Sequence, residues 1–98
     1  LDNIKNSKIV LPESDTDNDS FHLFVIRTNQ RKKLIKYLTN NKIGFGIHYA
    51  VPIHLQKAYK FLGYKKESLP ITENFSKQIL SLPIFPELTG AEVKHIIK

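Results

Sequence analysis

The stretch FHLFVIRTNQRKKLIKYLTNN, residues 21–41, decides the fold class, because within it a strand pattern gives way to a helix pattern. Its first part, FHLFVI, is mostly apolar and includes aromatic and β-branched side chains. Such a run suits a strand that is covered on both faces. We therefore predict a strand near residues 23–27, in a domain that combines strands with helices.

The second part of this stretch predicts an amphipathic helix over residues 30–41. Leu34, Ile35 and Leu38 recur at helical spacing, while most of the basic residues around them fall on the other face. Helices often begin at a Ser, Thr, Asn or Asp side chain and end at a Gly or Asn in left-handed conformation. The candidate N-caps are Thr28 and Asn29, and the candidate stop is Asn41.

Residues 43–49 predict a second strand, which contains Gly44 and Gly46. Glycine within a strand is typical of a bulge or of a place where another group approaches the backbone closely. Pro52 is expected to end this strand, because proline lacks the backbone N–H that a sheet uses.

Residues 54–62 predict a short helix closed by Gly63, since glycine readily adopts the left-handed conformation at a helix C-terminus. Its apolar positions recur at helical spacing. They predict a buried stripe of Leu55, Ala58, Tyr59 and Leu62.

A further helix is expected to begin after Ser68, because the proline that follows is tolerated in a first turn. Phe75, Ile79 and Leu80 are expected to continue its apolar side. Residues 81–85 resemble a short strand bounded by prolines.

Thr89 and Glu92 fit the capping box, in which a threonine hydroxyl and a glutamate three residues later satisfy each other's free backbone N–H groups. The final helix is expected near residues 92–98, packing Val93, Ile96 and Ile97. Together these elements predict a small α/β (α+β) domain, with two or three strands in a mixed or antiparallel sheet flanked by helices.

Residues 1–20 predict a connector and an acidic loop, so the domain itself is expected to cover residues 21–98. The segment holds one short apolar patch, residues 9–11, before a polar run with four acidic residues. The chain begins at Leu1 without an initiator methionine and stops within an apolar helical pattern that has no cap. We expect a piece of a longer protein.

The composition is that of an ordinary globular domain, with 41% hydrophobic and 24% charged residues. No apolar run approaches the roughly 20 residues of a membrane span and no leader pattern is present, so we expect a cytoplasmic protein without membrane contact. The net charge of +6 comes mostly from scattered lysines, which favours a solvated surface over nucleic-acid binding. The absence of cysteine excludes disulfides, thiolate catalysis and cysteine metal sites.

Four short motifs follow one another in a fixed order. GFGIHYAVPIHLQ at residues 44–56 resembles the G-I-x-x-x-I-H-Y-P-x-P-x-H-x-Q stretch of the DegT/DnrJ/StrS family of aminotransferases, with Ala50 where a proline is common. LPITE at residues 69–73 is similar to that family's L-P-x-x-E, and LSLPIFP at residues 80–86 to its L-S-L-P-x-x-P. HLFVIR at residues 22–27 looks like the strand that opens the family's small domain.

The resemblance implies the C-terminal small domain of a pyridoxal-phosphate-dependent enzyme of fold type I. Such an enzyme moves an amino group, usually from glutamate, onto a nucleotide-linked keto-sugar in cell-surface polysaccharide or amino-sugar biosynthesis. It also implies a homodimeric parent whose large domain, absent here, holds the cofactor and the Schiff-base lysine. This chain is then expected to contact its own large domain, to contain no catalytic residue, to bind no pyridoxal phosphate and to be inactive alone.

His48, Tyr49 and His54 are the candidate substrate-binding residues. A neutral imidazole donates and accepts hydrogen bonds, and a tyrosine offers an aromatic plane and a hydroxyl, which suits a sugar nucleotide. Without the family, a histidine at a strand end is more often a structural group, and core packing is as good an account of Tyr49. The resemblance implies that this loop faces the cleft between small and large domains, which places His48 and Tyr49 above His54.

No metal site is expected. His48 and His54 are too far apart in sequence to share a helical face as a zinc-binding pair does, and no third ligand is evident. Glu73 is expected to cap or pair at a helix start rather than to act as an acid. Two other functions stay open: a stand-alone module that binds an acidic partner, and a parent that uses the fold for dehydration or regulation.

Overall fold

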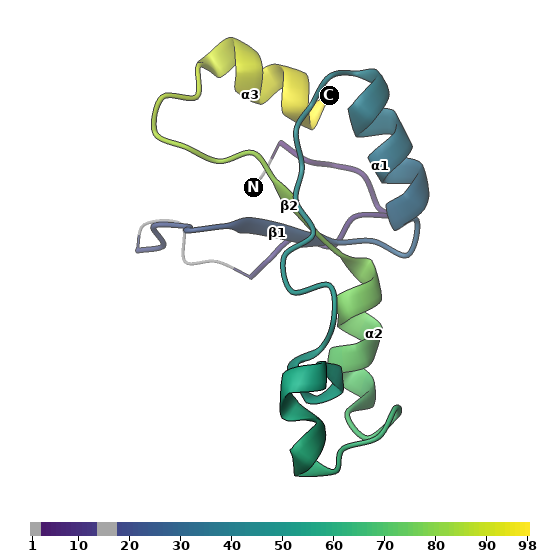
Figure 1. Cartoon of the computed structure of the whole chain (residues 1–98). Coiled ribbons are helices and arrows are strands. Elements are labelled where there is room, and N and C mark those ends of the chain that lie inside the picture. The colour runs from purple at the N-terminus through teal and green to yellow at the C-terminus, as the bar shows by residue number, and fades with distance from the viewer. Residues whose placement is uncertain (1–2, 14–17) are drawn as a thin grey trace.

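A two-stranded antiparallel sheet lies at the centre of the molecule, in a computed structural model that describes residues 3–13 and 18–98. Its strands are β1 (Phe24–Arg27) and β2 (Ile79–Leu82), paired over their full length from Phe24 with Leu82 to Arg27 with Ile79 (Figure 1). The small α/β class is confirmed, and of the two predicted sheet types the antiparallel one is present.

Two single bridges extend this sheet at its outer edges. The N–H of Val10 donates to the carbonyl of Arg27 at 2.8 Å, and the N–H of Arg27 donates back at 2.9 Å. On the other edge, Gly46 and Ser81 exchange two hydrogen bonds of 3.0 and 2.8 Å. Part of the segment before residue 21 therefore pairs with the sheet.

Three helices surround the strands: α1 (Arg31–Asn40), α2 (Pro70–Gln78) and α3 (Gly90–Ile97). α1 and α3 lie on the same side of the sheet, whereas α2 leads away from it toward the opposite end of the molecule (Figure 1). The buried core lies between the sheet and α1, because apolar side chains of both are covered there. It consists of Ile26, Leu38, Ile43, Leu80 and Leu82, with Ile4, Ile9, Leu11, Phe24, Leu34, Ile35 and Ile96 packed against it.

The predicted helix over residues 30–41 is present as α1, but its ends differ from the prediction. Its N-cap is Gln30, and the Thr28 hydroxyl accepts the Gln30 N–H at 3.1 Å in the preceding turn. Asn41 has a φ of −92°, so it is not left-handed; Lys42, with a φ of 56°, takes that conformation. The amide of Asn41 donates instead to the carbonyl of Tyr37 at 2.8 Å, which holds Asn41 at the helix end.

The predicted strand over residues 43–49 is wrong, because only Gly46 forms a bridge there. The chain leaves the sheet after that bridge, and Tyr49 has a φ of 57°, which no strand residue adopts. We call residues 44–52 the His48 loop.

The predicted helix over residues 54–62 is two 3₁₀ turns, η1 (Ile53–Leu55) and η2 (Lys57–Leu62). Gln56 between them is extended, with a ψ of 143°, and interrupts the helical hydrogen bonding. No side chain of η2 is buried, so the expected stripe is absent, whereas Gly63 does close the segment with a φ of 77°. We call residues 51–69 the 3₁₀ lobe; it packs beside α2 at the far end of the molecule (Figure 1).

The strand expected at residues 81–85 begins two residues earlier, so Ile79 and Leu80 belong to β2 rather than to the apolar side of α2. Leu80 pairs with Ile26 and is almost fully buried, which a continued helix would not provide. The Arg31 guanidinium stabilises the change from helix to strand, because it donates to the carbonyls of Ser76 at 2.7 Å and Ile79 at 3.2 Å.

The capping box before α3 is confirmed. Thr89 N–H donates to the Glu92 carboxylate at 2.8 Å, and the Glu92 N–H donates to the Thr89 hydroxyl at 3.3 Å. Ile96 packs against the core as expected, whereas Val93 is 38% exposed and lies outside the core cluster. In the described ranges, no helix has the length and apolar character to cross a membrane.

Candidate functional site

The His48 loop is tied to β2 through one residue, Ser81. The backbone of Ser81 bridges Gly46, and the Ser81 hydroxyl lies 2.8 Å from Nδ1 of the His48 imidazole. Ser81 itself is buried, whereas His48 is exposed. The buried Ser81 therefore holds one ring nitrogen of the exposed His48 and the backbone just before it.

Gly46 provides the space that this imidazole occupies. A Cβ on Gly46 would lie 2.7 Å from Cε1 and 3.2 Å from Nδ1 of His48, closer than such atoms approach one another, so the ring lies directly on the Gly46 backbone. The predicted close approach is confirmed at Gly46. At Gly44 it is not, because an added Cβ would meet nothing within 4 Å.

Tyr49 projects from the loop in a strained conformation. Its side chain is 76% exposed, and its φ of 57° is unusual for a bulky L-residue. Strain at an exposed aromatic residue calls for a reason outside local packing, and such outliers gather at binding sites. The alternative of a core role for Tyr49 does not fit this exposure.

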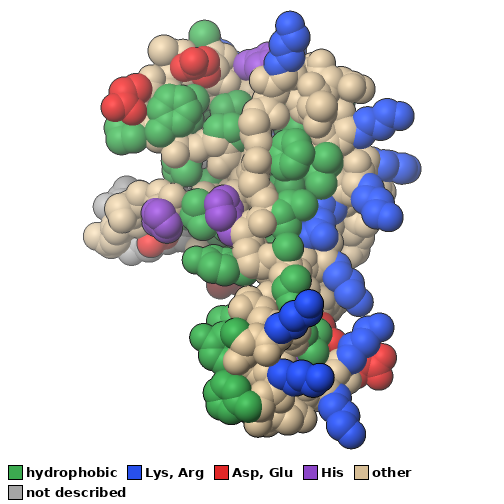
Figure 2. Space-filling model, in the orientation of Figure 1, with side chains coloured by type: hydrophobic (Ala, Val, Ile, Leu, Met, Phe, Trp, Pro, Cys, Tyr) green, Lys and Arg blue, Asp and Glu red, His purple; other side chains and the backbone are tan. Residues whose placement is uncertain are grey.

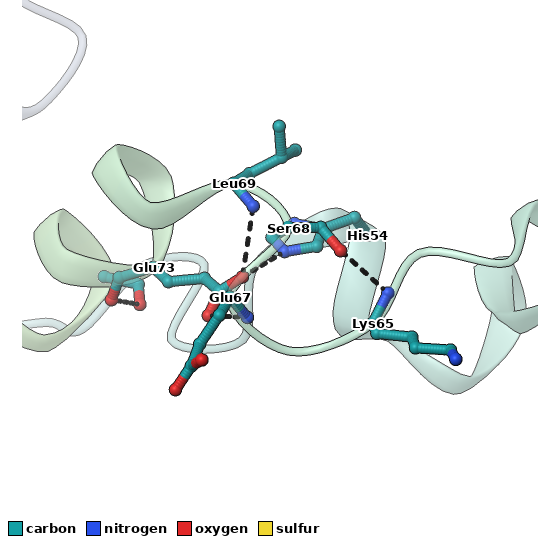
Figure 3. Close-up of polar contacts among 7 residues, drawn as sticks. His54, Lys65, Glu67, Ser68, Leu69 and Glu73 are labelled. Atoms are coloured by element: carbon teal, nitrogen blue, oxygen red, sulfur yellow. Dashed lines mark hydrogen bonds and ion pairs between the residues drawn. The ribbon is translucent and has the colours of Figure 1, made fainter.

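His54 lies in a different environment, buried within the 3₁₀ lobe (Figure 3). Its Nε2 donates to Oε1 of Glu73 at 2.8 Å. The same carboxylate accepts the N–H of Glu67 at 2.9 Å and that of Leu69 at 3.4 Å. Glu73 thus joins η1, the loop before α2, and α2 itself, and the prediction that it caps or pairs at a helix start is confirmed.

Hydrogen bonding controls the charge of this carboxylate. The bond from His54 contributes most to lowering the pKa of Glu73, and the N–H groups of Glu67 and Leu69 lower it further, while burial acts in the opposite sense. Glu73 is therefore ionised at neutral pH and is a poor proton donor there.

The two histidines consequently differ in what they can do. A carboxylate only accepts, so Nε2 of His54 must carry the proton and is already engaged. A serine hydroxyl both donates and accepts, so Ser81 is compatible with either tautomer of His48. His48 and Tyr49 are neighbours in the same exposed loop, whereas His54 is buried and bonded to Glu73.

Exposed apolar side chains gather around the His48 loop and the 3₁₀ lobe. Figure 2 shows them as a band along the middle of the molecule that widens on one side of the lobe, while Lys and Arg side chains line the opposite side. Monomeric surfaces seldom carry so many large exposed apolar groups together. They include Phe45, Ile47, Tyr49, Val51, Ile53, Tyr59, Phe61, Leu62, Tyr64 and Ile71.

Lysines are the residues to which pyridoxal phosphate could be attached covalently. Of the 15 lysines and arginines, two are Arg27 and Arg31, which leaves thirteen lysines, and every one of them is exposed. A cofactor lysine needs a pocket for the ring and a partner for the pyridine nitrogen. Nor do three metal-ligating side chains gather anywhere in residues 3–13 and 18–98.

The fold and these motifs define an aminotransferase domain, and comparison with known proteins gives the family. The profile of the DegT/DnrJ/EryC1/StrS aminotransferase family matches residues 1–98, so the chain belongs to that family. Over its whole length the chain is 38% identical to the dTDP-3-amino-3,6-dideoxy-alpha-D-galactopyranose transaminase of Aneurinibacillus thermoaerophilus, of which it covers 27%.

Solved structures give the same result. The DesV protein of S. venezuelae, solved in complex with a ketimine intermediate, superposes with a TM-score of 0.89 at 36% identity, over 99% of this chain and 27% of that one. The sugar aminotransferase Spr1654 of Streptococcus pneumoniae, described as putative and solved in its PLP form, gives 0.81 at 28% identity, over 98% and 26%. The chain thus spans about a quarter of the length of these relatives.

Proposed function

We propose that this chain is the C-terminal small domain of a pyridoxal-phosphate-dependent sugar-nucleotide aminotransferase. The parent enzyme transfers an amino group from glutamate to a nucleotide-linked keto-sugar, in the cytoplasm, for amino-sugar or cell-surface polysaccharide synthesis. We assign the cofactor and the Schiff-base lysine to the rest of the parent, and the exposure of every lysine of this chain supports this.

The geometry of the His48 loop is the main observation that supports this proposal. It presents an imidazole held by Ser81 and, at the next residue, a strained and exposed tyrosine. An imidazole that can donate or accept, next to an aromatic plane with a hydroxyl, suits the hydroxyl and phosphate groups of a sugar nucleotide. We assign substrate contact to His48 and Tyr49, and an indirect role to His54, which holds the 3₁₀ lobe through Glu73.

The exposed apolar band supports a second part of the proposal, contact with the parent's own large domain within a homodimer. Large exposed apolar patches of this kind are typical of surfaces that bind another protein surface. The alternative of a stand-alone module for an acidic partner rests on the lysines, which lie across the front and along one side of the lobe (Figure 2). Family membership favours the enzyme.

Replacing His48 by Ala in the intact parent tests the substrate assignment. We expect sugar-nucleotide binding to weaken by about 1 to 3 kcal/mol, as for a lost hydrogen bond to a buried or charged partner. The absorbance band of the bound cofactor should stay unchanged, because His48 is assigned to the substrate alone. Calorimetric titration and an absorbance spectrum measure the two effects. Normal binding, or loss of the cofactor band, would show the assignment to be wrong.

The isolated chain provides a second test. Since its lysines are exposed and the Schiff-base lysine is assigned to the rest of the parent, the purified 98 residues should show no transaminase turnover and no cofactor absorbance band. Turnover by this fragment above the level of free pyridoxal phosphate contradicts the proposal.

A further inference from the structure

One buried hydroxyl and one missing side chain determine where the His48 imidazole lies. Nδ1 of the ring is 2.8 Å from the Ser81 hydroxyl, and the ring face lies where a Gly46 Cβ would be. These two contacts constrain different motions. The hydrogen bond opposes rotation of the ring about its Cβ–Cγ bond, and the glycine leaves room for the rotamer that makes this bond.

The two contacts come from residues that also pair with each other. Gly46 and Ser81 exchange both backbone hydrogen bonds of an antiparallel bridge. The position of the hydroxyl relative to the glycine is therefore set by the sheet and not by the loop. β2 in turn pairs with β1 at this residue, because Ser81 lies opposite Val25. The ring is fixed with respect to the most rigid part of the domain.

Resting on the proposed function, we infer that Ser81 and Gly46 are positioning residues that hold the His48 imidazole for the sugar nucleotide. Ser81 holds Nδ1, so Nε2 is the nitrogen offered to the ligand. Because a hydroxyl tolerates both tautomers, Nε2 can donate to a phosphate or carbonyl oxygen, or accept from a sugar hydroxyl. A carboxylate in place of Ser81 would hold the proton on Nδ1, so Nε2 of the neutral ring could only accept.

Two substitutions in the intact parent test this inference from opposite sides of the ring. Ser81→Ala removes the hydroxyl but keeps both backbone bonds to Gly46. Gly46→Ala adds the methyl group that the ring would meet at 2.7 Å, and its backbone needs no left-handed conformation. We expect each to weaken sugar-nucleotide binding about 2- to 10-fold, the range for one neutral hydrogen bond. The first half-reaction with the amino donor should be unchanged, which a general loss of structure would not allow.

The chain offers a matched control for each variant. Ser76 is also buried and its hydroxyl donates to the carbonyl of Glu73 at 2.8 Å, away from His48. Gly44 has open space where its Cβ would be. Ser76→Ala and Gly44→Ala should therefore bind sugar nucleotide like the unchanged enzyme. Ser81→Thr, which retains the hydroxyl, should recover most of the affinity lost in Ser81→Ala.

A double-mutant cycle separates this inference from the proposed function. If Ser81 acts through His48, then Ser81→Ala has no further effect on sugar-nucleotide binding in a His48→Ala background. Additive losses, or normal binding by both Ser81→Ala and Gly46→Ala while His48→Ala is impaired, overturn the positioning role and leave the substrate role standing. Normal binding by His48→Ala overturns the substrate role, and the positioning role with it. Crystal structures of the two variants should show the imidazole displaced; a ring that stays in place also overturns the inference.

Discussion

Tyr49 combines a left-handed backbone with a nearly free side chain. Such a backbone costs an L-residue about 1 kcal/mol or more, and nothing in the packing of an exposed ring offsets this cost. The conformation leaves the ring exposed at the residue after His48. At position 49 the stability of the fold therefore favours glycine, whereas the proposed contact with substrate favours tyrosine.

Comparing Tyr49→Gly with Tyr49→Ala isolates the strain. Both remove the ring, so both should weaken sugar-nucleotide binding in the intact parent. Glycine relieves about 1 to 2 kcal/mol of strain and adds about 0.4 to 1 kcal/mol of unfolded-chain entropy. Tyr49→Gly should thus be at least as stable as Tyr49→Ala in urea unfolding. A clearly less stable glycine variant would mean that Tyr49 is not strained.

Glu73 gives the domain a pH dependence whose sign follows from its contacts. Its folded-state pKa is lowered, first by the bond from His54 and then by the N–H groups of Glu67 and Leu69. The stability that it contributes is therefore fully present above the ordinary carboxyl pKa. It is lost as the pH falls through the lower folded-state pKa.

Replacing Glu73 by Gln should lower the urea midpoint at pH 7, because an amide lacks the charge and one of the two accepting oxygens. The difference from the unchanged protein should shrink as the pH falls, since the native carboxylate is protonated there too. Glu87→Gln, at an exposed position, is the matched control and should leave the midpoint unchanged at every pH. A difference that persists undiminished in acid contradicts the role given to the charge.

The stability of α3 depends on the side-chain contacts of its first turn. None of its residues is fully buried, and its N-terminus is closed by Thr89 and Glu92. The N–H and hydroxyl of Thr89 also lower the pKa of Glu92. The Glu92 carboxylate therefore stays negatively charged at neutral pH, next to the positive N-terminal end of the helix dipole.

Thr89→Ala should destabilise the domain by about 1 kcal/mol, the usual effect of losing an N-cap side chain. Thr89→Ser keeps the hydroxyl and should restore nearly all of this stability. Thermal unfolding followed by circular dichroism measures both variants. Equal stability of the alanine and serine variants would show that the cap is not what holds α3 in place.

The elements also show which structural features can be predicted from neighbouring residues alone. The capping box at Thr89 and the left-handed Gly63 were predicted correctly, because both depend on a few neighbouring residues. Ile79 and Leu80 continue a helical pattern locally, yet they pair with β1, which lies far away in the sequence. Gly46 likewise meets Ser81 only in the folded chain. Errors arose where a distant partner decides between helix, strand and loop.

The same distinction applies to the candidate site. The His-Tyr pair stands out in a motif, and Glu73 was expected to pair near a helix start, so both were accessible from sequence. The partner of His48 was not, since Ser81 lies 33 residues further along and the serine carries no mark of its role. His54 resembled His48 in sequence, and only the contact with Glu73 separates their environments.

At the scale of the whole molecule, the domain is elongated, with extents of 48 × 32 × 24 Å. The sheet, α1 and α3 form one end, which contains the buried core, and α2 leads to the 3₁₀ lobe at the other (Figure 1). Within the described residues, the lobe is held mainly by the polar contacts of Glu73 rather than by buried apolar groups. Its apolar side chains face outward instead (Figure 2).

This outward arrangement has a calorimetric consequence. The heat capacity of a protein reflects how much apolar surface water covers, so a lobe whose aromatic groups are already hydrated adds little to it on unfolding. When a covering surface binds, those same groups lose their water and the heat capacity of the system falls. Loosening of the lobe in the free chain should therefore be nearly silent in a scanning calorimeter. Its docking should appear as a binding enthalpy that becomes steeply more negative with rising temperature.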